Sequence, residues 1–206
     1  MRTLVVAALL ALPLVRIAMA QDRMPEIPAD KMTEAQKKAA EEFAAGRGTP
    51  VFGPFVPLLR SPEVMLRAKA MGDYLRFKNS LPAKLSEFTI LITARQWTQQ
   101  YEWDVHYPIA IKAGLSAELA KAVAEGRRPQ SMPADEELVY DFVTELHDTK
   151  SVSDATYARA VTRFGEQGVI DMIGVNGYYT FLAMVMNTAR TALPPDHKSA
   201  LPAFPR

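Results

Sequence analysis

Apolar residues recur along this chain with the spacing of helices, and no segment shows the apolar–polar alternation of a half-buried strand. Ser, Thr and Pro at helix starts and Gly at several helix ends divide the pattern into separate elements. The predicted helices cover residues 33–46, 83–97, 98–114, 116–124, 133–147, 154–164 and 166–190, and one more begins at Ser61–Pro62. We therefore expect an all-α fold, a compact helical bundle with short connections.

Three features of the pattern predict how these elements pack. The helix at 83–97 is apolar on nearly every side and should lie at the centre of the bundle. The helix that begins at Ser61–Pro62 should bury one stripe, formed by Val64, Ala68, Met71 and Leu75. The segment 48–59 carries three prolines, so it should not be helical. This strap is expected to pack on the core, to wall a pocket or to form a subunit contact.

The long apolar run at 166–190 admits two interpretations. Its length and composition would suit a membrane-spanning helix. However, Asp171, Asn176 and glycines interrupt the run, and polar side chains are costly inside a lipid-facing helix. A buried or interface helix is therefore favoured.

The helix at 98–114 has a mixed face that needs a chemical explanation. Gln99, Glu102, Trp103 and His106 follow the spacing of one helix side. A face that only supported the core would normally be apolar throughout. Glu87, in the preceding helix, is either a first-turn acid favoured by the helix dipole or a buried acid that points at His106.

Composition narrows the class of protein. A chain of 206 residues with 49% apolar residues suits one globular domain with its own core. The 24 basic and 23 acidic residues nearly balance and form no basic block, which argues against a nucleic-acid partner. The absence of cysteine excludes disulfides and thiol chemistry.

The first twenty residues have the pattern of a signal peptide. Arg2 precedes an apolar run of signal-peptide length, and Ala18-Met19-Ala20 forms a small-x-small cleavage site before Gln21. We expect an exported protein, periplasmic or secreted, without membrane attachment after cleavage. We assign residues 1–20 to the signal peptide, 21–48 to a leader and helix, 49–193 to the main helical domain and 194–206 to a Pro-rich tail.

Four segments then form a recognisable order along the chain. They are GPFVPLLRSPEV, LSEFTIL, the pattern Q-x-x-E-W-x-x-H-x-x-x-A-x-x-x-G-L-S that begins at Gln99, and the stretch from Val152 to Thr188. This order resembles the carboxymuconolactone decarboxylase family, which includes the alkyl hydroperoxidase D branch. The resemblance spans about residues 53–193 and implies an all-α bundle of the alkyl hydroperoxidase D-like type, assembled into homo-oligomers, either trimers or hexamers.

Two branches of that family imply different chemistry. The peroxidase branch uses a C-x-x-C pair, and those positions fall on Gln99 and Glu102, so its thiols are missing here and peroxidase activity is disfavoured. The decarboxylase branch is more similar, because it too has a Glu four residues before the His. It converts a carboxylated lactone of aromatic catabolism into an enol-lactone without metal or organic cofactor. The export signal, and Glu87 in place of a common arginine-type residue, are departures that bear on the substrate.

The resemblance and the residues together give an expected role to each side chain. His106 would protonate carbon after loss of CO2, Glu102 would orient the imidazole, and Glu87 would complete a proton relay. We assign substrate contacts to Arg60, Gln99, Tyr101, Trp103, Tyr178 and Tyr179. The tyrosines would donate to a developing oxyanion, Trp103 would form an apolar wall, and Arg60 would face a substrate carboxylate.

Other interpretations of the same residues stay open. The Glu–His pair could only fix helix packing, and the chain would then be a catalytically silent oligomeric binding or scaffold protein. Isomerisation or lactone hydrolysis could use the same pair. A metal site formed by Glu87, Glu102 and His106 is disfavoured, because His147 and His197 are expected at the surface and neither joins it.

Overall fold

The structure is a computed structural model, in which residues 22–194, 197 and 201 are described. The expected signal peptide at 1–20 and most of the Pro-rich tail lie outside the described residues. The regular elements are η1 (Ala29–Lys31), α1 (Glu34–Arg47), α2 (Phe55–Leu58), α3 (Pro62–Phe77), α4 (Ala83–Gln96), α5 (Gln100–Lys112), α6 (Ala117–Ala124), α7 (Ala134–Thr149) and α8 (Asp154–Ala189). Every element in this part of the chain is helical, which confirms the all-α prediction.

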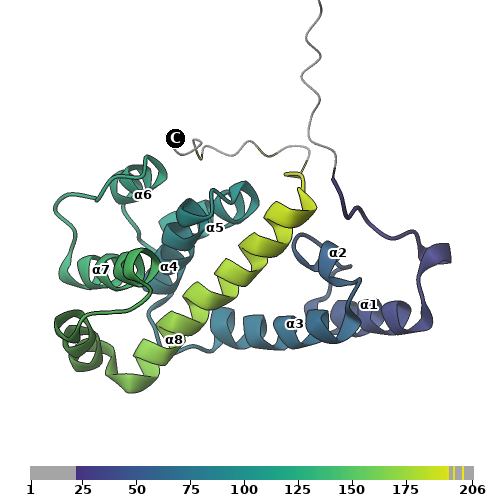
Figure 1. Ribbon diagram of the computed structural model, residues 1–206, viewed down its shortest axis with the longest axis horizontal. Coiled ribbons are helices and arrows are strands. Elements are labelled where there is room, and N and C mark those ends of the chain that lie inside the picture. Colours follow the sequence, from purple (N-terminus) through teal and green to yellow (C-terminus); the bar gives the residue numbers. More distant parts are fainter. Residues whose placement is uncertain (1–21, 195–196, 198–200, 202–206) are drawn as a thin grey trace, which may run out of the picture.

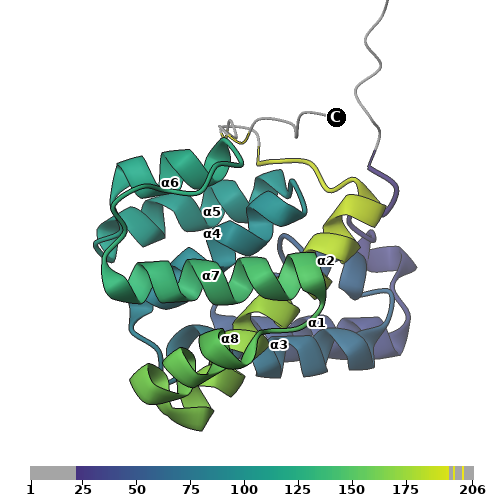
Figure 2. The same ribbon diagram turned by 60° about the vertical axis from the view of Figure 1, so that its left-hand side comes forward.

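Helix α8 crosses the whole molecule and divides it into two halves. Figure 1 shows α8 running diagonally, with α4–α7 on one side and α1–α3 on the other. In Figure 2, α7 and α6 come forward and cover the α4–α5 pair. Helix α4 contacts α5, α6, α7 and α8, and most of its residues are buried, so the prediction that it is central is confirmed.

Two hydrophobic cores result from this division. The first core joins α4–α7 to the first half of α8, with members such as Phe88, Ala110, Leu119, Phe142 and Met172. The second core joins α1–α3 to the second half of α8, with members such as Phe43, Phe55, Met65, Leu182 and Met186. The seam between the two cores is where α4, α5 and α8 meet the segment that contains α2.

The ends of the helices follow their sequence signals. Thr33 caps α1 in a capping box with Gln36, and Gly48 ends it with a φ of 68°. Ser153 caps α8 through its bond from the Thr156 amide. Gly165 has non-helical angles, φ 68° and ψ 173°, so α8 changes direction there. The predicted separation of 154–164 from 166–190 is therefore correct.

The apolar run in α8 is a core helix within the described chain. By length and composition α8 could cross a membrane, but 56% of its most apolar window is buried inside the protein. Asp171, which interrupts the run, accepts bonds from the Ser80 amide and hydroxyl at 2.8 and 2.7 Å, and from the Tyr74 hydroxyl at 3.1 Å. These bonds satisfy the buried carboxylate and fix α8 against the α3–α4 connection.

Two local predictions are wrong. The strap contains a helical turn, α2, because Pro54 and Pro57 occupy early positions where a helix needs no amide donors. In α3 the buried stripe is Met65, Ala68, Gly72 and Leu75, whereas Val64 and Met71 are 44% and 47% exposed. Gly72 explains this rotation, since a Cβ there would lie 2.3 Å from the Tyr178 hydroxyl of α8.

Candidate active site

The corner between α4 and α5 sets the position of the candidate site. Helix α4 ends at Gln96, and Thr98 adopts a left-handed φ of 47° that reverses the chain. The Gln99 side chain then accepts a 2.7 Å bond from the Tyr101 amide and caps α5. Helix α5 therefore begins at Gln100, two residues later than predicted, and packs along α4.

This packing places His106 between two carboxylates. Its Nδ1 lies 2.7 Å from Oε2 of Glu87 on α4, and its Nε2 lies 3.4 Å from Oε2 of Glu102, one turn earlier on α5. His106 is 2% exposed, and the side chains of Glu87 and Glu102 are 12% and 4% exposed. The interpretation of Glu87 as a buried acid that points at His106 is confirmed.

The two carboxylates favour the charged form of the imidazole. Burial alone lowers the pKa of His106, but the hydrogen bonds and negative charges of Glu102 and Glu87 outweigh burial and raise it above its ordinary value. A carboxylate accepts bonds only, so each ring nitrogen of the imidazolium can donate to its neighbouring carboxylate. The two carboxylates therefore hold a proton on the His106 ring more firmly than an isolated imidazole would hold it.

Glu102 has one oxygen that is not used within the protein. Its Oε1 is buried and has no hydrogen-bond partner among the described residues. Leaving a buried acceptor unpaired costs about 1–3 kcal/mol, more when the group is charged. An unpaired buried acceptor of this kind calls for a specific explanation, such as a bound water, an ion or a catalytic role.

Glu102 and His106 line a small cavity of about 70 Å³ at the seam between the two cores. Tyr101 and Val105 of α5, and Tyr178, Tyr179 and Leu182 of α8, line it as well. The N-terminal half of the chain closes it with Arg47, Phe52, Pro54, Phe55 and Arg76. The strap therefore walls a pocket, one of the roles expected for it.

The tyrosines place neutral hydroxyl groups at this cavity. The Tyr179 ring meets the His106 ring edge-on, with centroids 4.9 Å apart, and Tyr178 packs against Tyr179 at 5.3 Å. Burial raises the pKa of Tyr178 and Tyr179 well above the ordinary value. For Tyr101, burial and then the charges of Glu102 and Asp104 raise the pKa. All three therefore stay protonated and can donate a hydrogen bond.

Solved structures with this helix arrangement identify the fold. An uncharacterised peroxidase-related protein from Silicibacter sp. TM1040 aligns with a TM-score of 0.68 at 14% identity, covering 86% of this chain and 94% of that one. The alkylhydroperoxidase AhpD core of a peroxidase-related protein from Ralstonia eutropha JMP134 aligns with a TM-score of 0.66 at 15% identity, covering 84% and 93%. The chain has the alkyl hydroperoxidase D-like fold.

A third structure with the alkyl hydroperoxidase D-like fold is a debrominase solved with 2,3,4-tribromopyrrole. It aligns with a TM-score of 0.63 at 11% identity, covering 86% of this chain and 94% of that one. No protein-family model and no curated protein sequence matches the chain. Identities this low show the fold, and the fold hosts enzymes, but they do not carry a substrate from one chain to another.

Three predicted substrate contacts lie outside the cavity. The Gln99 side chain accepts the capping bond from the Tyr101 amide and donates a 2.8 Å bond to Asn187 of α8. Trp103 is buried in the first core and stacks on Tyr107. Arg60 donates to the main-chain carbonyls of Met24 and Pro25 and so ties the leader to α2. The face of α5 that meets the cavity is rotated from the predicted one.

Sequence reasoning missed two cationic residues of the cavity, Arg47 and Arg76. Neither arginine is among the predicted site residues, because neither shows a sequence pattern that separates it from a solvated arginine. Both come from helices far from His106 along the chain, and only the tertiary fold brings them to the site.

The alternative of a metal site is not supported by the geometry of the three ligands. Glu87 and Glu102 face opposite nitrogens of the His106 ring, so one ion on a single ring nitrogen would not meet both of these oxygens. No cluster of three or more His, Asp or Glu suited to a metal occurs in the described part of the chain. His147 contacts Asn176, and His197 contacts Asp104, so neither joins the site.

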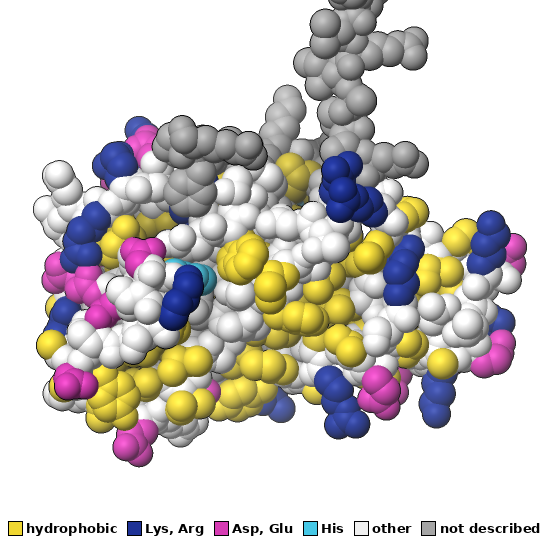
Figure 3. Space-filling model, viewed as in Figure 1, with side chains coloured by type: hydrophobic (Ala, Val, Ile, Leu, Met, Phe, Trp, Pro, Cys, Tyr) yellow, Lys and Arg dark blue, Asp and Glu magenta, His cyan; other side chains and the backbone are white. Residues whose placement is uncertain are grey.

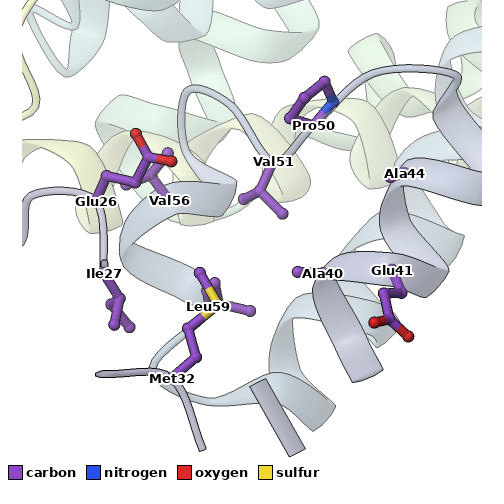
Figure 4. Close-up of a pocket in the computed structure, with 10 residues that line it drawn as sticks. All are labelled: Glu26, Ile27, Met32, Ala40, Glu41, Ala44, Pro50, Val51, Val56 and Leu59. Atoms are coloured by element: carbon purple, nitrogen blue, oxygen red, sulfur yellow. The ribbon is translucent and has the colours of Figure 1, made fainter. Parts of the chain in front are cut away.

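A larger cavity, of about 280 Å³, lies elsewhere, between the leader and α1–α2. Figure 4 shows apolar side chains facing this space, among them Met32, Val51 and Leu59, with Glu26 and Glu41 at its edges. It contains no histidine and no arginine. We therefore locate the acid–base chemistry at the smaller cavity beside His106.

Proposed function

We propose that this protein is an exported, cofactor-independent enzyme of the carboxymuconolactone decarboxylase family. It acts by Glu/His acid–base chemistry on a small carboxylated or lactone-type substrate. The observation that carries the proposal is the contact of His106 with both Glu87 and Glu102, together with the position of Glu102 at the cavity and its unpaired Oε1. Most buried polar atoms in proteins have a hydrogen-bond partner, so the unpaired oxygen favours contact with a ligand over a role in helix packing alone.

In this proposal, Glu87 and Glu102 have roles that differ from those expected from the sequence. Glu87 makes the short bond, so it orients the imidazole and stabilises its charge, a role we had expected of Glu102. Glu102 has the weaker contact with His106 and the unpaired oxygen, so it is the acid that meets the substrate. Protons then pass between His106 and the substrate through Glu102.

A decarboxylation would proceed at this site in two steps. The bond between the ring carbon and the substrate carboxylate breaks, CO2 leaves, and the electron pair moves into the conjugated lactone as an enolate. Tyr178 or Tyr179 donates a hydrogen bond to the enolate oxygen. A carbon of the enolate then takes the proton that His106 supplies through Glu102, and His106 regains a proton from water.

Proton NMR of the purified protein with a carboxylated muconolactone, in the presence of a chelator, tests the proposal. The wild type should convert the lactone, and His106→Ala should slow turnover by about 10²–10⁴-fold, the usual contribution of a general acid. Circular dichroism establishes that the variant is folded. Equal turnover by the two proteins would refute the acid–base role. Line broadening without conversion would instead support the binding or scaffold protein of the same fold.

The cellular location is part of the proposal. The signal-peptide pattern of residues 1–20 supports export, with an aqueous periplasmic or secreted destination. Amino-terminal sequencing of the protein from an expressing cell and from its surroundings would test it. The expected mature chain begins at Gln21.

We also propose a homo-oligomer, a trimer or hexamer. Val64 and Met71 of α3 and Phe181 and Met184 of α8 form an apolar surface, here called the α3–α8 patch. Grooves of about 410 and 450 Å³ meet at Phe181. Figure 3 shows hydrophobic side chains gathered on the face that α8 and α3 cross. An apolar surface of this kind is typical of a subunit interface.

A further inference from the structure

The cavity beside His106 contains a second chemical feature, its two arginines. Arg47 is held firmly by the protein. Its Nη2 lies 2.7 Å from Asp73, and its guanidinium packs over the rings of Phe43 and Phe55 at 5.9 and 5.6 Å. Asp73 also pairs with Lys69 at 2.8 Å, so one carboxylate serves two cations. This side of the cavity therefore has an excess of positive charge.

Arg76 adds a further positive charge and is not neutralised. It is half-buried in the last turn of α3. Its guanidinium lies over the Phe77 ring at 5.4 Å, and it makes no hydrogen bond or ion pair with any described residue. By contrast, Arg67 on the same helix pairs with Glu63 at 3.3 Å and is 84% exposed. Arg76 is thus a cation on a cavity wall with its hydrogen-bonding capacity unused.

The charge of Arg76 acts on the groups that surround His106. At the hydroxyls of Tyr178 and Tyr179, burial raises the pKa and the charge of Arg76 partly offsets that rise. Arg76, both tyrosines and Glu102 line one and the same cavity. This wall therefore joins a free cation to neutral donors and to the unpaired Oε1 of Glu102.

We infer that Arg76 binds one carboxylate group of a small ligand whose proton-exchanging carbon or hydroxyl faces Glu102. Arginine matches a carboxylate with two parallel N–H donors, which fixes the orientation of the ligand as well as its charge. A cavity of about 70 Å³ limits the bound part of the ligand to a few heavy atoms.

This subsite deepens the proposed function, because it selects the carboxylated substrate, yet its binding step can be measured without turnover. Acetate and acetamide form the simplest charged and neutral pair of probes. We would follow the ring-proton NMR signals of His106 and Tyr179 during titration with each, at one pH and ionic strength. The proteins are the wild type, Arg76→Gln, Arg76→Lys and the control Arg67→Gln.

Acetate should shift these signals in the wild type and in Arg67→Gln, and acetamide should not. Arg76→Gln should weaken acetate binding by about 10- to 100-fold, as expected for the loss of a charged hydrogen bond, and Arg76→Lys should restore part of it. If acetate moves no cavity signal, or if Arg76→Gln binds it as the wild type does, the subsite is refuted. Binding that falls equally in Arg67→Gln reports only general surface charge and also overturns it.

The carboxylated muconolactone and its methyl ester separate this inference from the proposed function. Acetate binding that depends on Arg76, without conversion of the lactone, keeps the subsite and refutes the decarboxylase. Conversion with an unchanged KM in Arg76→Gln keeps the enzyme and refutes the subsite. If both are correct, Arg76→Gln raises the KM for the acid by about 10-fold or more and leaves the affinity for the ester unchanged.

Discussion

His106 lies between two carboxylates that differ in distance and in what else they contact. The bond to Glu87 is 2.7 Å long, whereas Glu102 lies 3.4 Å away and keeps an oxygen free. Two carboxylates at equal distances from His106 would stabilise a proton on Nδ1 and a proton on Nε2 to the same extent. In the mechanism proposed above, this asymmetry is the reason why Glu87 on α4 positions the imidazole and Glu102 on α5 exchanges protons with the ligand.

Glu87→Gln should reveal the raised pKa of His106 in the pH dependence of stability. Because the folded pKa lies above the ordinary 6.5, the native state holds this proton more tightly than the unfolded state does. The stabilisation is fully present below about pH 6.5, and it is lost as the pH rises through the folded pKa. Removing the Glu87 charge should lower that pKa and flatten this fall in the free energy of unfolding.

Urea titrations at a series of pH values, together with NMR titration of the His106 ring, measure the effect. Glu34→Gln is the matched control, since Glu34 is 90% exposed in its pair with Lys37 and should leave the slope unchanged. If the free energy of unfolding of Glu87→Gln changed with pH as steeply as that of the wild type, the contact between Glu87 and His106 would not raise the pKa of His106.

Sequence predicts the meeting of Glu87 and His106 better than it predicts the residues that line the cavity beside them. Glu87 and His106 lie on neighbouring helices joined by a short corner, so their meeting follows from local pairing. Arg76 reaches the cavity only through the contacts of α3 with α8. A half-buried arginine on a surface helix has no pattern that separates it from a solvated one.

At the scale of elements, the helices were predictable and their rotations were less so. In α3, apolar residues occupy two neighbouring faces, and the choice between them depends on Tyr178, which packs closely against Gly72. In α5, the predicted face contained Glu102 and His106 correctly but added Trp103, which belongs to the first core. Periodicity gives the spacing of a face, whereas the neighbouring helices decide which face is used.

Two glycines of α8 should respond in opposite directions to alanine. Gly165 has φ 68° and ψ 173°, a region essentially restricted to glycine, so Gly165→Ala should destabilise the protein by about 1–3 kcal/mol. No atom lies within 4 Å of a Cβ added at either site. The backbone conformation alone therefore determines how alanine changes the stability. Gly177 is helical, and Gly177→Ala should stabilise the helix by about 0.5–1 kcal/mol. Thermal unfolding of both variants measures the change in stability. If both variants were less stable than the wild type, side-chain packing would outweigh the backbone effect.

At the scale of the whole molecule, the α3–α8 patch predicts the assembly state. Met71→Lys places a charge on a side chain that is 47% exposed in the single chain, so it should not disturb the fold. In sedimentation experiments the wild type should form a trimer or hexamer, and Met71→Lys should sediment as a single chain. Tyr107→Lys, at a 36% exposed aromatic residue outside the patch, should assemble normally. A wild type that sediments as a single chain contradicts the assembly.

The second core also constrains the order in which parts of the protein can fold during synthesis. It joins α1–α3, the first helices to be synthesised, to residues Val175–Met186, among the last. Until α8 is complete, the side chains of α1–α3 lack the α8 surface that completes this core in the folded protein. A nascent chain that is arrested, or cleaved, before α8 would therefore leave α1–α3 without a core, and such a fragment is a substrate for chaperones and proteases. In the export proposed above, the second core would therefore stay incomplete until the α8 residues had also crossed the membrane.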